Sequence, residues 1–197
     1  MRKVVVSEFV SLDGVVEDPS WTLQFSSEEQ EKYKFAELAA ADALLLGRMT
    51  YEEFAAAWPT MMNQYDGPRQ AELGEYAEMM NGYPKHVVSR TLQEPLEWNN
   101  STLVRGNVAE EINELKQRPG KDILVFGSAA LAGTLLDHDL IDEYRIMVFP
   151  IVVGSGKHLF EDGIDTKVLK LAKTETFGSG VVVLTYEPEG TDAGEKG

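Results

Sequence analysis

The sequence predicts an α/β protein of three layers, with a mostly parallel central sheet, helices on both faces and an antiparallel hairpin at the C-terminal end. Two observations support this fold class. Short apolar strand patterns alternate with helix patterns up to about residue 150, as expected for crossover units in a parallel sheet. Two longer alternating segments follow, joined by Gly178-Ser179-Gly180, which is a three-residue hairpin signal.

The individual elements follow from local signals. Short runs rich in Val, Ile and Leu and bounded by Gly or Pro indicate buried strands. These strands are expected at residues 3–10, 43–46, 86–89, 102–105, 122–126, 143–150, 168–177 and 181–187. Ser, Thr or Asn followed three residues later by Glu indicates a helix start. Helices are expected at residues 27–40, 50–58, 69–80, 107–118 and 129–136, the second capped by Thr50 and ended by Pro59.

The length of 197 residues and a hydrophobic content of 43% suit one folded domain. We expect this domain to span residues 1–187, followed by a polar, Gly-rich and disordered tail at 188–197. Residues 60–84 are harder to interpret. Asn63 and Gly67 indicate a loop before the helix, and this segment could form a lid, a dimer surface or another packing helix.

Composition excludes several classes of function. There are 18 Lys and Arg against 33 Asp and Glu, a net charge of −15, which opposes binding to nucleic acid or to anionic membranes. Cysteine is absent and the three histidines lie far apart, so no metal site is expected. The N-terminus lacks a signal-peptide pattern, and no apolar stretch is long enough to span a membrane. We therefore expect a cytoplasmic protein.

Three strand ends carry residues suited to an anionic ligand. The strands predicted to end near residues 47 and 127 each deliver a glycine to a helix start, and Ser89 and Arg90 follow a strand between them. Helix N-termini present free N–H groups and a positive dipole end, and ligands of open α/β sheets bind beyond the carboxyl ends of the strands. Each junction taken alone suits an ordinary turn. Together, with arginines at positions 48 and 90, they favour an anionic ligand.

The order of these motifs resembles the dihydrofolate reductase-like superfamily. More closely, it resembles the C-terminal reductase domain of the bifunctional riboflavin-biosynthesis deaminase-reductase, and the resemblance covers residues 2–187. It is carried by Ser11-Leu12-Asp13-Gly14, Leu46-Gly47-Arg48-Met49-Thr50-Tyr51-Glu52, Val88-Ser89-Arg90, Phe126-Gly127-Ser128-Ala129-Ala130-Leu131, and Pro150-Ile151-Val152-Val153-Gly154-Ser155-Gly156 with Leu159-Phe160.

The resemblance implies an enzyme that uses NADPH to reduce a small heterocyclic substrate, as does 5-amino-6-(5-phosphoribosylamino)uracil reductase of riboflavin biosynthesis. It implies cofactor-binding roles for Gly47, Arg48, Thr50, Ser89, Arg90, Gly127, Ser128, Ala129 and Leu131. It places Asp13, Gly14, Trp58, Gly154, Gly156 and Phe160 at the substrate. Relatives often have Gly-Gly, sometimes with a cis peptide, where this chain has Gly127-Ser128.

Two alternatives remain open at this point. Asp13 is the candidate proton donor, but an Asp before Gly commonly caps its own turn. The chain has no room for the zinc deaminase, so another pterin-like substrate, or a non-catalytic nucleotide-, flavin- or pterin-binding regulatory protein on this fold, is also possible. The β-branched C-terminal hairpin would leave an unprotected edge, from which we expect a homodimer.

Overall fold

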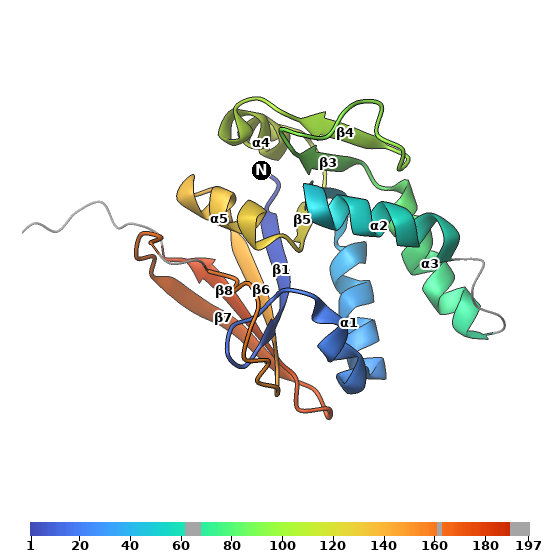
Figure 1. The fold of residues 1–197 in the computed structure, drawn as a ribbon, viewed down its shortest axis with the longest axis vertical. Coiled ribbons are helices and arrows are strands. Elements are labelled where there is room, and N and C mark those ends of the chain that lie inside the picture. The colour runs from blue at the N-terminus through green and yellow to red at the C-terminus, as the bar shows by residue number, and fades with distance from the viewer. Residues whose placement is uncertain (62–67, 161–162, 190–197) are drawn as a thin grey trace, which may run out of the picture.

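The computed structural model describes residues 1–61, 68–160 and 163–189. Eight strands form one sheet in the order β4-β3-β2-β5-β1-β6-β8-β7, which is parallel from β4 to β6 and antiparallel at β8 and β7 (Figure 1). The predicted fold class is therefore confirmed. The strands are β1 Val4–Ser11, β2 Ala41–Gly47, β3 Lys85–Val88, β4 Ser101–Val104, β5 Asp122–Phe126, β6 Glu143–Phe149, β7 Leu169–Thr176 and β8 Val182–Pro188.

Helices cover both faces of the sheet, each over its own apolar cluster. The helices are α1 Glu28–Ala39, α2 Arg48–Met61, α3 Pro68–Gly82, α4 Val108–Gln117 and α5 Ala129–Asp137, with a 3-10 helix at Pro19–Phe25. Side chains of α1, α2 and α3 pack on one face, where Leu38 and Met80 are fully buried. Side chains of α4 and α5 pack on the other, where Ile112 and Leu135 are buried. Figure 1 shows the two groups on opposite sides of β1 and β5.

Two predicted boundaries of α2 are wrong. The helix begins at Arg48, so Thr50 lies inside it and is not the cap, and it continues through Pro59 to Met61. Packing against α3 explains the continuation. The Trp58 ring lies 5.4 Å from that of Tyr76, and Asn81 Nδ2 donates to the Trp58 carbonyl at 3.1 Å. These contacts hold the last turn even though a proline removes one helical hydrogen bond.

Some predictions fall partly or wholly outside the described residues. The loop expected at Asn63 and Gly67 lies outside them, as do residues 190–197 of the expected tail. The helix expected to follow that loop is present as α3. The described strand β8 reaches Pro188, the first residue assigned to the tail. Within the described ranges, no helix has both the length and the apolar character to cross a membrane.

Strand β1 lies at the centre of the sheet, paired in parallel with β5 and β6. Its alternate residues face opposite sides, with Val4 and Val6 in the cluster under α4 and α5 and Val5 in the cluster under α1 to α3. Two polar residues, Ser7 and Glu8, interrupt this apolar strand and are buried. They point to opposite faces because side chains alternate along a strand.

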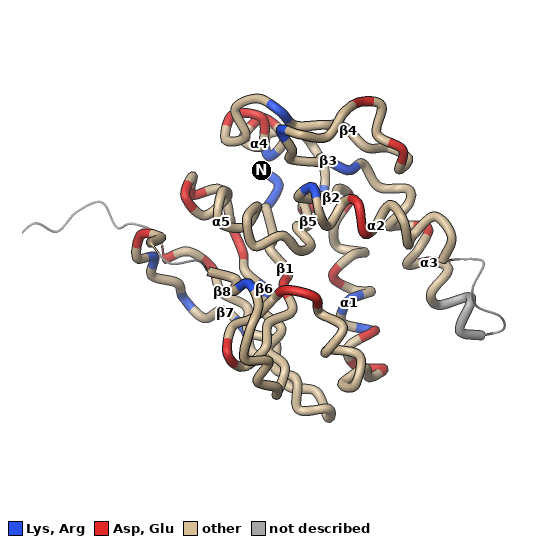
Figure 2. Tube along the Cα trace, viewed as in Figure 1, with Lys and Arg blue, Asp and Glu red and all other residues tan. Residues whose placement is uncertain are grey.

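Charge is distributed over the whole molecule. Figure 2 shows acidic residues on several helices and loops, with basic residues between them. The net charge of −15 therefore does not arise from a single acidic segment of the described chain. Local groupings of charge, and not the overall sign, decide which ligands a given surface accepts.

Candidate functional site

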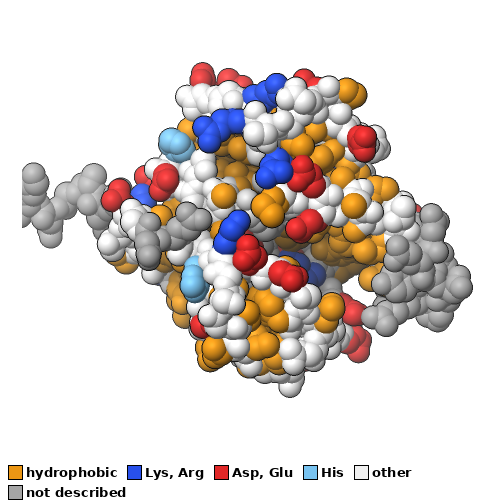
Figure 3. Space-filling model, viewed as in Figure 1, with side chains coloured by type: hydrophobic (Ala, Val, Ile, Leu, Met, Phe, Trp, Pro, Cys, Tyr) orange, Lys and Arg blue, Asp and Glu red, His pale blue; other side chains and the backbone are white. Residues whose placement is uncertain are grey.

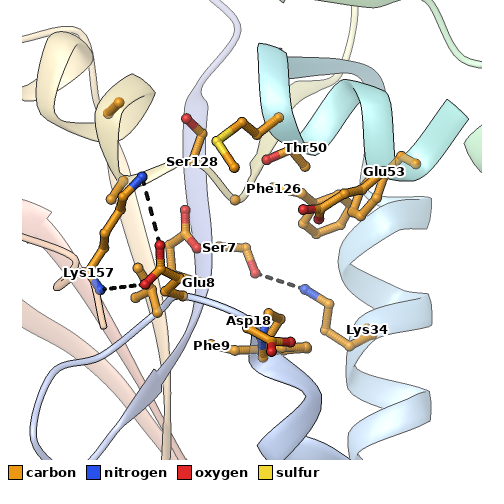
Figure 4. Close-up of a pocket in the computed structure, with 18 of the residues that line it drawn as sticks. Ser7, Glu8, Phe9, Asp18, Lys34, Thr50, Glu53, Phe126, Ser128 and Lys157 are labelled. Atoms are coloured by element: carbon orange, nitrogen blue, oxygen red, sulfur yellow. Dashed lines mark hydrogen bonds and ion pairs between the residues drawn. The ribbon is translucent and has the colours of Figure 1, made fainter. Parts of the chain in front are cut away.

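A cavity of about 450 Å³ opens where α2 and α5 begin, beyond the carboxyl ends of β2 and β5. Figure 3 shows a hollow near the middle of this face, with acidic and basic side chains at its edge and hydrophobic ones beside it. Figure 4 shows labelled residues from β1, α1, α2, the start of α5 and the loop at Lys157 around it. Its lining comprises Ser7, Glu8, Phe9, Val16, Glu17, Asp18, Pro19, Lys34, Met49, Thr50, Glu53, Phe54, Trp58, Tyr76, Met80, Phe126, Gly127, Ser128, Ala129, Ala130 and Lys157.

Two glycines allow the helix starts to approach each other. A Cβ atom on Gly47 would lie 2.6 Å from the Ser128 Cβ, and a Cβ on Gly127 would lie 2.9 Å from the Thr50 Oγ1. Each glycine thus faces a side chain from the other junction. Real Cβ atoms do not approach this closely, so both positions require glycine. Gly127 also has a φ of +62°, which glycine adopts without strain.

The start of α5 is a cap with an unusual backbone. Ser128 has a φ of +70°, and its Oγ accepts a hydrogen bond from the Leu131 N–H at 3.3 Å. Other N–H groups in the first turn of a helix have no partner within it, and Ala129 and Ala130 line the cavity. Glu94–Pro95 is the one cis bond in the described chain, so the Gly127–Ser128 bond is trans.

Aromatic rings form one wall of the cavity. Phe54 lies 6.2 Å from Trp58 and 6.4 Å from Phe126, edge to face in both cases, and Tyr76 lies against Trp58. Burial raises the pKa of the Tyr76 hydroxyl well above its ordinary value. Packed rings of this kind offer flat surfaces to a flat ligand.

Lys34 brings a fixed positive charge to this wall. Its Nζ donates to Ser7 Oγ at 2.9 Å, pairs with Glu37, and lies 4.3 Å from the centre of the Phe126 ring. Ser7 in turn donates to Glu37 Oε2 at 2.9 Å. Since Glu37 and Ser7 are buried, these contacts compensate the desolvation of the charges. The ion pair with Glu37 holds the ammonium group at the cavity. Figure 4 shows the hydrogen bond between Lys34 and Ser7.

Glu8, on the opposite face of β1 from Ser7, is a buried carboxyl in the cavity lining. The residue is 5% exposed, and its Oε1 has no hydrogen-bond partner among the described residues. Burial raises the pKa of this carboxyl to about 8, against a smaller lowering by Lys34. The sequence reasoning did not select Glu8. The available signal was a charged residue in the middle of the apolar strand VVVSEFV.

The mouth of the cavity is lined by charges from two loops and from α2. Lys157 faces Glu17, with 3.8 Å between Nζ and Oε1, and its backbone N–H donates to Glu17 Oε2 at 3.3 Å. Asp18 and Glu53 complete the charged lining. The described lining thus contains four carboxyl groups and two lysines. An anion in the cavity would therefore be bound mainly by the N–H groups at the helix starts and by the lysines.

Asp13 is held in a network outside the cavity lining. Its carboxylate accepts hydrogen bonds from Ser11 Oγ at 2.7 Å, from the Val153 N–H at 3.0 Å and from the Gly154 N–H at 2.7 Å. These donors lower its pKa to about 2. A carboxylate so satisfied stays ionised at neutral pH, and this geometry favours the turn role over proton donation. A direct catalytic role for Asp13 stays a prediction.

The other sequence-predicted residues divide into two groups. Thr50, Trp58, Gly127, Ser128 and Ala129 line the cavity, and Gly47 lies directly behind Ser128. The lining as described does not include Arg48, Ser89, Arg90, Leu131, Gly14, Gly154, Gly156 or Phe160. The cofactor and substrate roles of this second group stay predictions.

The contacts of the second group are specific. Arg48 is half-exposed and pairs with Glu52 at 3.1 Å. The Ser89 hydroxyl accepts from the N–H groups of Thr91 and Leu92 at 3.2 and 3.1 Å, and Arg90 is exposed. The Leu131 side chain belongs to the core.

The remaining members of that group connect two loops. Gly14 approaches His158, and a Cβ on Gly156 would lie 2.7 Å from Val15. Gly154 donates to Asp13, and Phe160 is half-exposed. The turn at residues 11–14 and the loop at 150–159 are thereby locked together, which positions Lys157 at the cavity.

Similar solved structures define the class of this protein as one with a dihydrofolate reductase-like fold. A proposed riboflavin biosynthesis protein from Shewanella sp. PV-4 superposes with a TM-score of 0.72 at 24% identity, over 95% of this chain and 99% of that one. A pyrimidine reductase-like protein from Corynebacterium diphtheriae gives 0.63 at 12% identity, over 95% and 92%. Dihydrofolate reductase from Enterococcus faecalis, complexed with NADP(H) and RAB-propyl, gives 0.58 at 14% identity, over 94% and 96%.

The particular family is the RibD C-terminal domain, whose family model matches residues 2–183, and the chain belongs to it. Two Bacillus subtilis proteins are similar along nearly their whole length. YyaP is 31% identical over 189 residues, covering 96% of each chain. YwjB is 30% identical over 190 residues, covering 91% of this chain and 95% of its own. The family predicted from the order of motifs is confirmed.

We expect Asp13→Asn to lower the melting temperature and to make the loop at residues 150–159 more sensitive to proteases. The amide oxygen of Asn can accept a hydrogen bond from one of the two backbone N–H groups. The amide NH₂ is itself a donor, so it would face the other N–H group without forming a hydrogen bond. Because the folded-state pKa of Asp13 is lowered to about 2, the advantage of the wild type is present above about pH 4 and lost as pH falls toward 2.

The control for this experiment is Asp165→Asn, at an exposed position. The two variants are compared by thermal unfolding and limited proteolysis. An unchanged melting temperature for Asp13→Asn, combined with a loss of turnover of roughly 10²–10⁴-fold, would instead support the proton-donor role.

Proposed function

We propose that this protein is an NADPH-dependent reductase that transfers hydride to a small heterocyclic substrate. The observation that carries this proposal is the meeting of two glycine-ended strands and two helix starts at a single cavity with an aromatic wall. Helix starts suit the phosphates of a dinucleotide, and the rings suit a flat substrate. Membership in the RibD C-terminal domain family supports a reductase of the riboflavin-biosynthesis type.

The residues present fit a dinucleotide phosphate group. Gly47 and Gly127 leave no Cβ between the two helix starts, so backbone N–H groups stand open to a ligand. Thr50, Ser128 and Ala129 would hold the phosphates through hydroxyl and backbone donors. When bound, NADPH supplies the hydride. The solved relative from Enterococcus faecalis contains NADP(H).

The substrate end of the proposed site lies between the rings and the charged lining. Phe54, Trp58 and Phe126 offer a wall for a flat ring, and the Lys34 ammonium offers a charged donor beside it. A polar heterocycle uses both features, because its faces are flat and its edge carries hydrogen-bonding groups. The uracil derivative reduced in riboflavin biosynthesis and pterins belong to this chemical class.

The experiment that tests the function is NADPH oxidation, followed by absorbance, with a panel of pterins and pyrimidine precursors of riboflavin. Oxidation that depends on one of these compounds supports the reductase. NADPH binding without turnover on any compound would instead favour the alternative, a non-catalytic nucleotide-binding protein.

We expect Arg48→Ala or Arg90→Ala to weaken NADPH binding by roughly 10- to 150-fold while NADH binding changes little. The reason is that a guanidinium binds the additional phosphate of NADPH through paired charge-assisted hydrogen bonds. The preference should shrink as salt rises, because both arginines are exposed. Binding is measured by titration of cofactor fluorescence. Equal losses for both cofactors would place the arginines at the shared pyrophosphate, and no loss would leave them as surface residues.

Gly127→Ala should weaken NADPH binding by roughly tenfold or more, because the new methyl group would displace Thr50 at the phosphate position. Gly133→Ala is the matched control, since its Cβ would meet nothing within 4 Å and it lies inside α5, the helix that follows Gly127, where alanine is favourable. Thermal unfolding of each variant defines the temperature at which binding is compared. Wild-type affinity for NADPH in a folded Gly127→Ala protein would argue against a phosphate site at this junction.

The homodimer expected from the sequence becomes a further proposal. Strand β7 is at the edge of the sheet, and Val168 and Leu171 beside and within it are 63% and 50% exposed. Covering such an edge with a second copy removes a site for non-specific strand pairing. Sedimentation at micromolar concentration should give twice the chain mass of 21.9 kDa. A species of the chain mass alone would contradict it.

A further inference from the structure

The Glu8 carboxyl is buried without the hydrogen bonds that would explain its burial. It lies in the central strand, is 95% removed from solvent, lines the cavity, and leaves Oε1 without a partner in the described chain. Burying an unpartnered polar atom costs free energy. Ser7, its neighbour on the strand, has two partners. A ligand in the cavity would provide the hydrogen bond that the Glu8 carboxyl lacks.

We propose that Glu8 is the proton donor of the reductase, and that its substrate is a flat heterocycle with a C=N bond whose nitrogen accepts the Glu8 proton. This inference rests on the proposed function and names the chemical class of the substrate. In Figure 4, Glu8 is drawn between Lys157 and the Ser7–Lys34 pair, inside the ring of labelled cavity residues.

The surroundings of Glu8 keep it neutral near pH 7. The charged groups that line the same cavity are Lys34 from α1, Glu53 from α2, Glu17 and Asp18 from the loop after β1, and Lys157 from the loop after β6. Lys157 is paired with Glu17. Lys34 favours the ionised form of Glu8 but is bound to Glu37. Desolvation outweighs the Lys34 attraction and raises the Glu8 pKa to about 8.

Other groups are less suited to give a proton. Asp13 is ionised and accepts three hydrogen bonds. Tyr76 lines the cavity, but burial raises its pKa far above neutral. The Lys34 ammonium is engaged by Ser7 and Glu37. A general acid is most effective when its pKa lies near the working pH, and the raised pKa of Glu8 meets this condition.

The chemical step balances as follows. Hydride from NADPH forms a C–H bond at the carbon of the C=N group, and the π electron pair moves to the nitrogen. The nitrogen forms an N–H bond with the Glu8 proton, which leaves Glu8 as a carboxylate and the cofactor as NADP⁺. Glu8 is protonated again from solvent after product release. Before the step, the Glu8 O–H donates a hydrogen bond to the ring nitrogen, and this draws electrons from the carbon that accepts the hydride.

This arrangement selects among heterocycles. A ring nitrogen with a free lone pair accepts from the protonated Glu8 and satisfies the buried carboxyl. A ring that presents an N–H at the same position cannot accept the Glu8 O–H or its proton, so the donor would lose its partner and the nitrogen could not be protonated.

The first measurement is the protonation state of Glu8, which needs no substrate. The infrared carboxylic-acid stretch of the wild type minus that of Glu8→Gln should show a band at pH 7 that disappears as pH rises through about 8. Glu114→Gln, at an exposed position on α4, is the matched control and should leave this band in place. Absence of the band at pH 7 would overturn the proposal.

The second measurement is turnover with probe heterocycles that contain C=N bonds, namely dihydrofolate, dihydropterin and lumazine. Glu8→Gln keeps a hydrogen-bond donor but has no transferable proton. We expect it to bind NADPH like the wild type and to lower kcat by roughly 10²–10⁴-fold. Its kcat should also lack the decline that the wild type shows above about pH 8. Glu8→Asp, which keeps an acid, should recover part of kcat and covers the case in which Glu8→Gln does not fold.

The outcomes separate this inference from the function on which it rests. If the turnover of Glu8→Gln stays within about threefold of the wild-type value, Glu8 is not the proton donor, and the proposed reductase function is unaffected. Wild-type protein that oxidises NADPH with neither these probes nor the pyrimidine precursors would overturn both. Loss of NADPH binding in Glu8→Gln would assign Glu8 to the cofactor, not to the proton.

Discussion

The close approach of two strand-to-helix junctions is the constraint on which the site depends. Strands β2 and β5 are parallel neighbours, so α2 and α5 begin at the same edge of the sheet. The Gly47 and Gly127 positions, each facing a side chain of the other junction, let these helix starts come together. A larger residue at either position would separate them. Their backbone N–H groups could not then face the same cavity.

Strand β1 carries two adjacent buried polar residues with different surroundings. Because side chains alternate along a strand, Ser7 and Glu8 face opposite sides of the sheet. Register pairing places Ser7 beside Phe126 and Arg145, under α1 with Lys34 and Glu37. That side is a satisfied ionic cluster, and it fixes Lys34 at the cavity. On the other side, Glu8 Oε1 has no hydrogen-bond partner among the residues that the structure describes. The fold therefore keeps one of two adjacent polar groups available to a ligand.

The contact between the turn at residues 11–14 and the loop at 150–159 supports the site from outside it. The Asp13 carboxylate holds two N–H groups of that loop, and the bridge from Val15 to His158 continues the contact. These interactions bring Lys157 to Glu17 at the mouth of the cavity. In this structure, the motif that contains Asp13 therefore fixes the position of the loop at residues 150–159. The charged groups at the cavity belong to neighbouring residues, Glu17 and Lys157.

Local sequence signals were sufficient for the elements and their order. The Val-rich run at the start of the chain, the glycine after each buried strand and the hairpin glycines at 178–180 each encode a local conformation. The order of elements then limits the topology, because parallel strands need right-handed crossovers. The same reasoning brought the junctions that contain Thr50, Gly127, Ser128 and Ala129 to one edge of the sheet, since strand ends meet there. Trp58 was selected through the family resemblance alone, and all five residues line the cavity. It was wrong at Pro59, where packing on α3 outweighs the local tendency of proline to end a helix.

Tertiary structure alone decided which polar residues face the cavity. Lys34 lies on α1, and Tyr76 lies on α3, with no local motif to mark either. Glu8 stands in an ordinary strand, and its protonation depends on burial and on the charge of Lys34 from α1. Asp13 carries a recognisable motif, and its pKa is lowered first by the Ser11 hydroxyl two residues away and then by N–H groups 140 and 141 residues away in the sequence. A pKa depends on desolvation and on charges close in space, so it is determined only when distant segments come together.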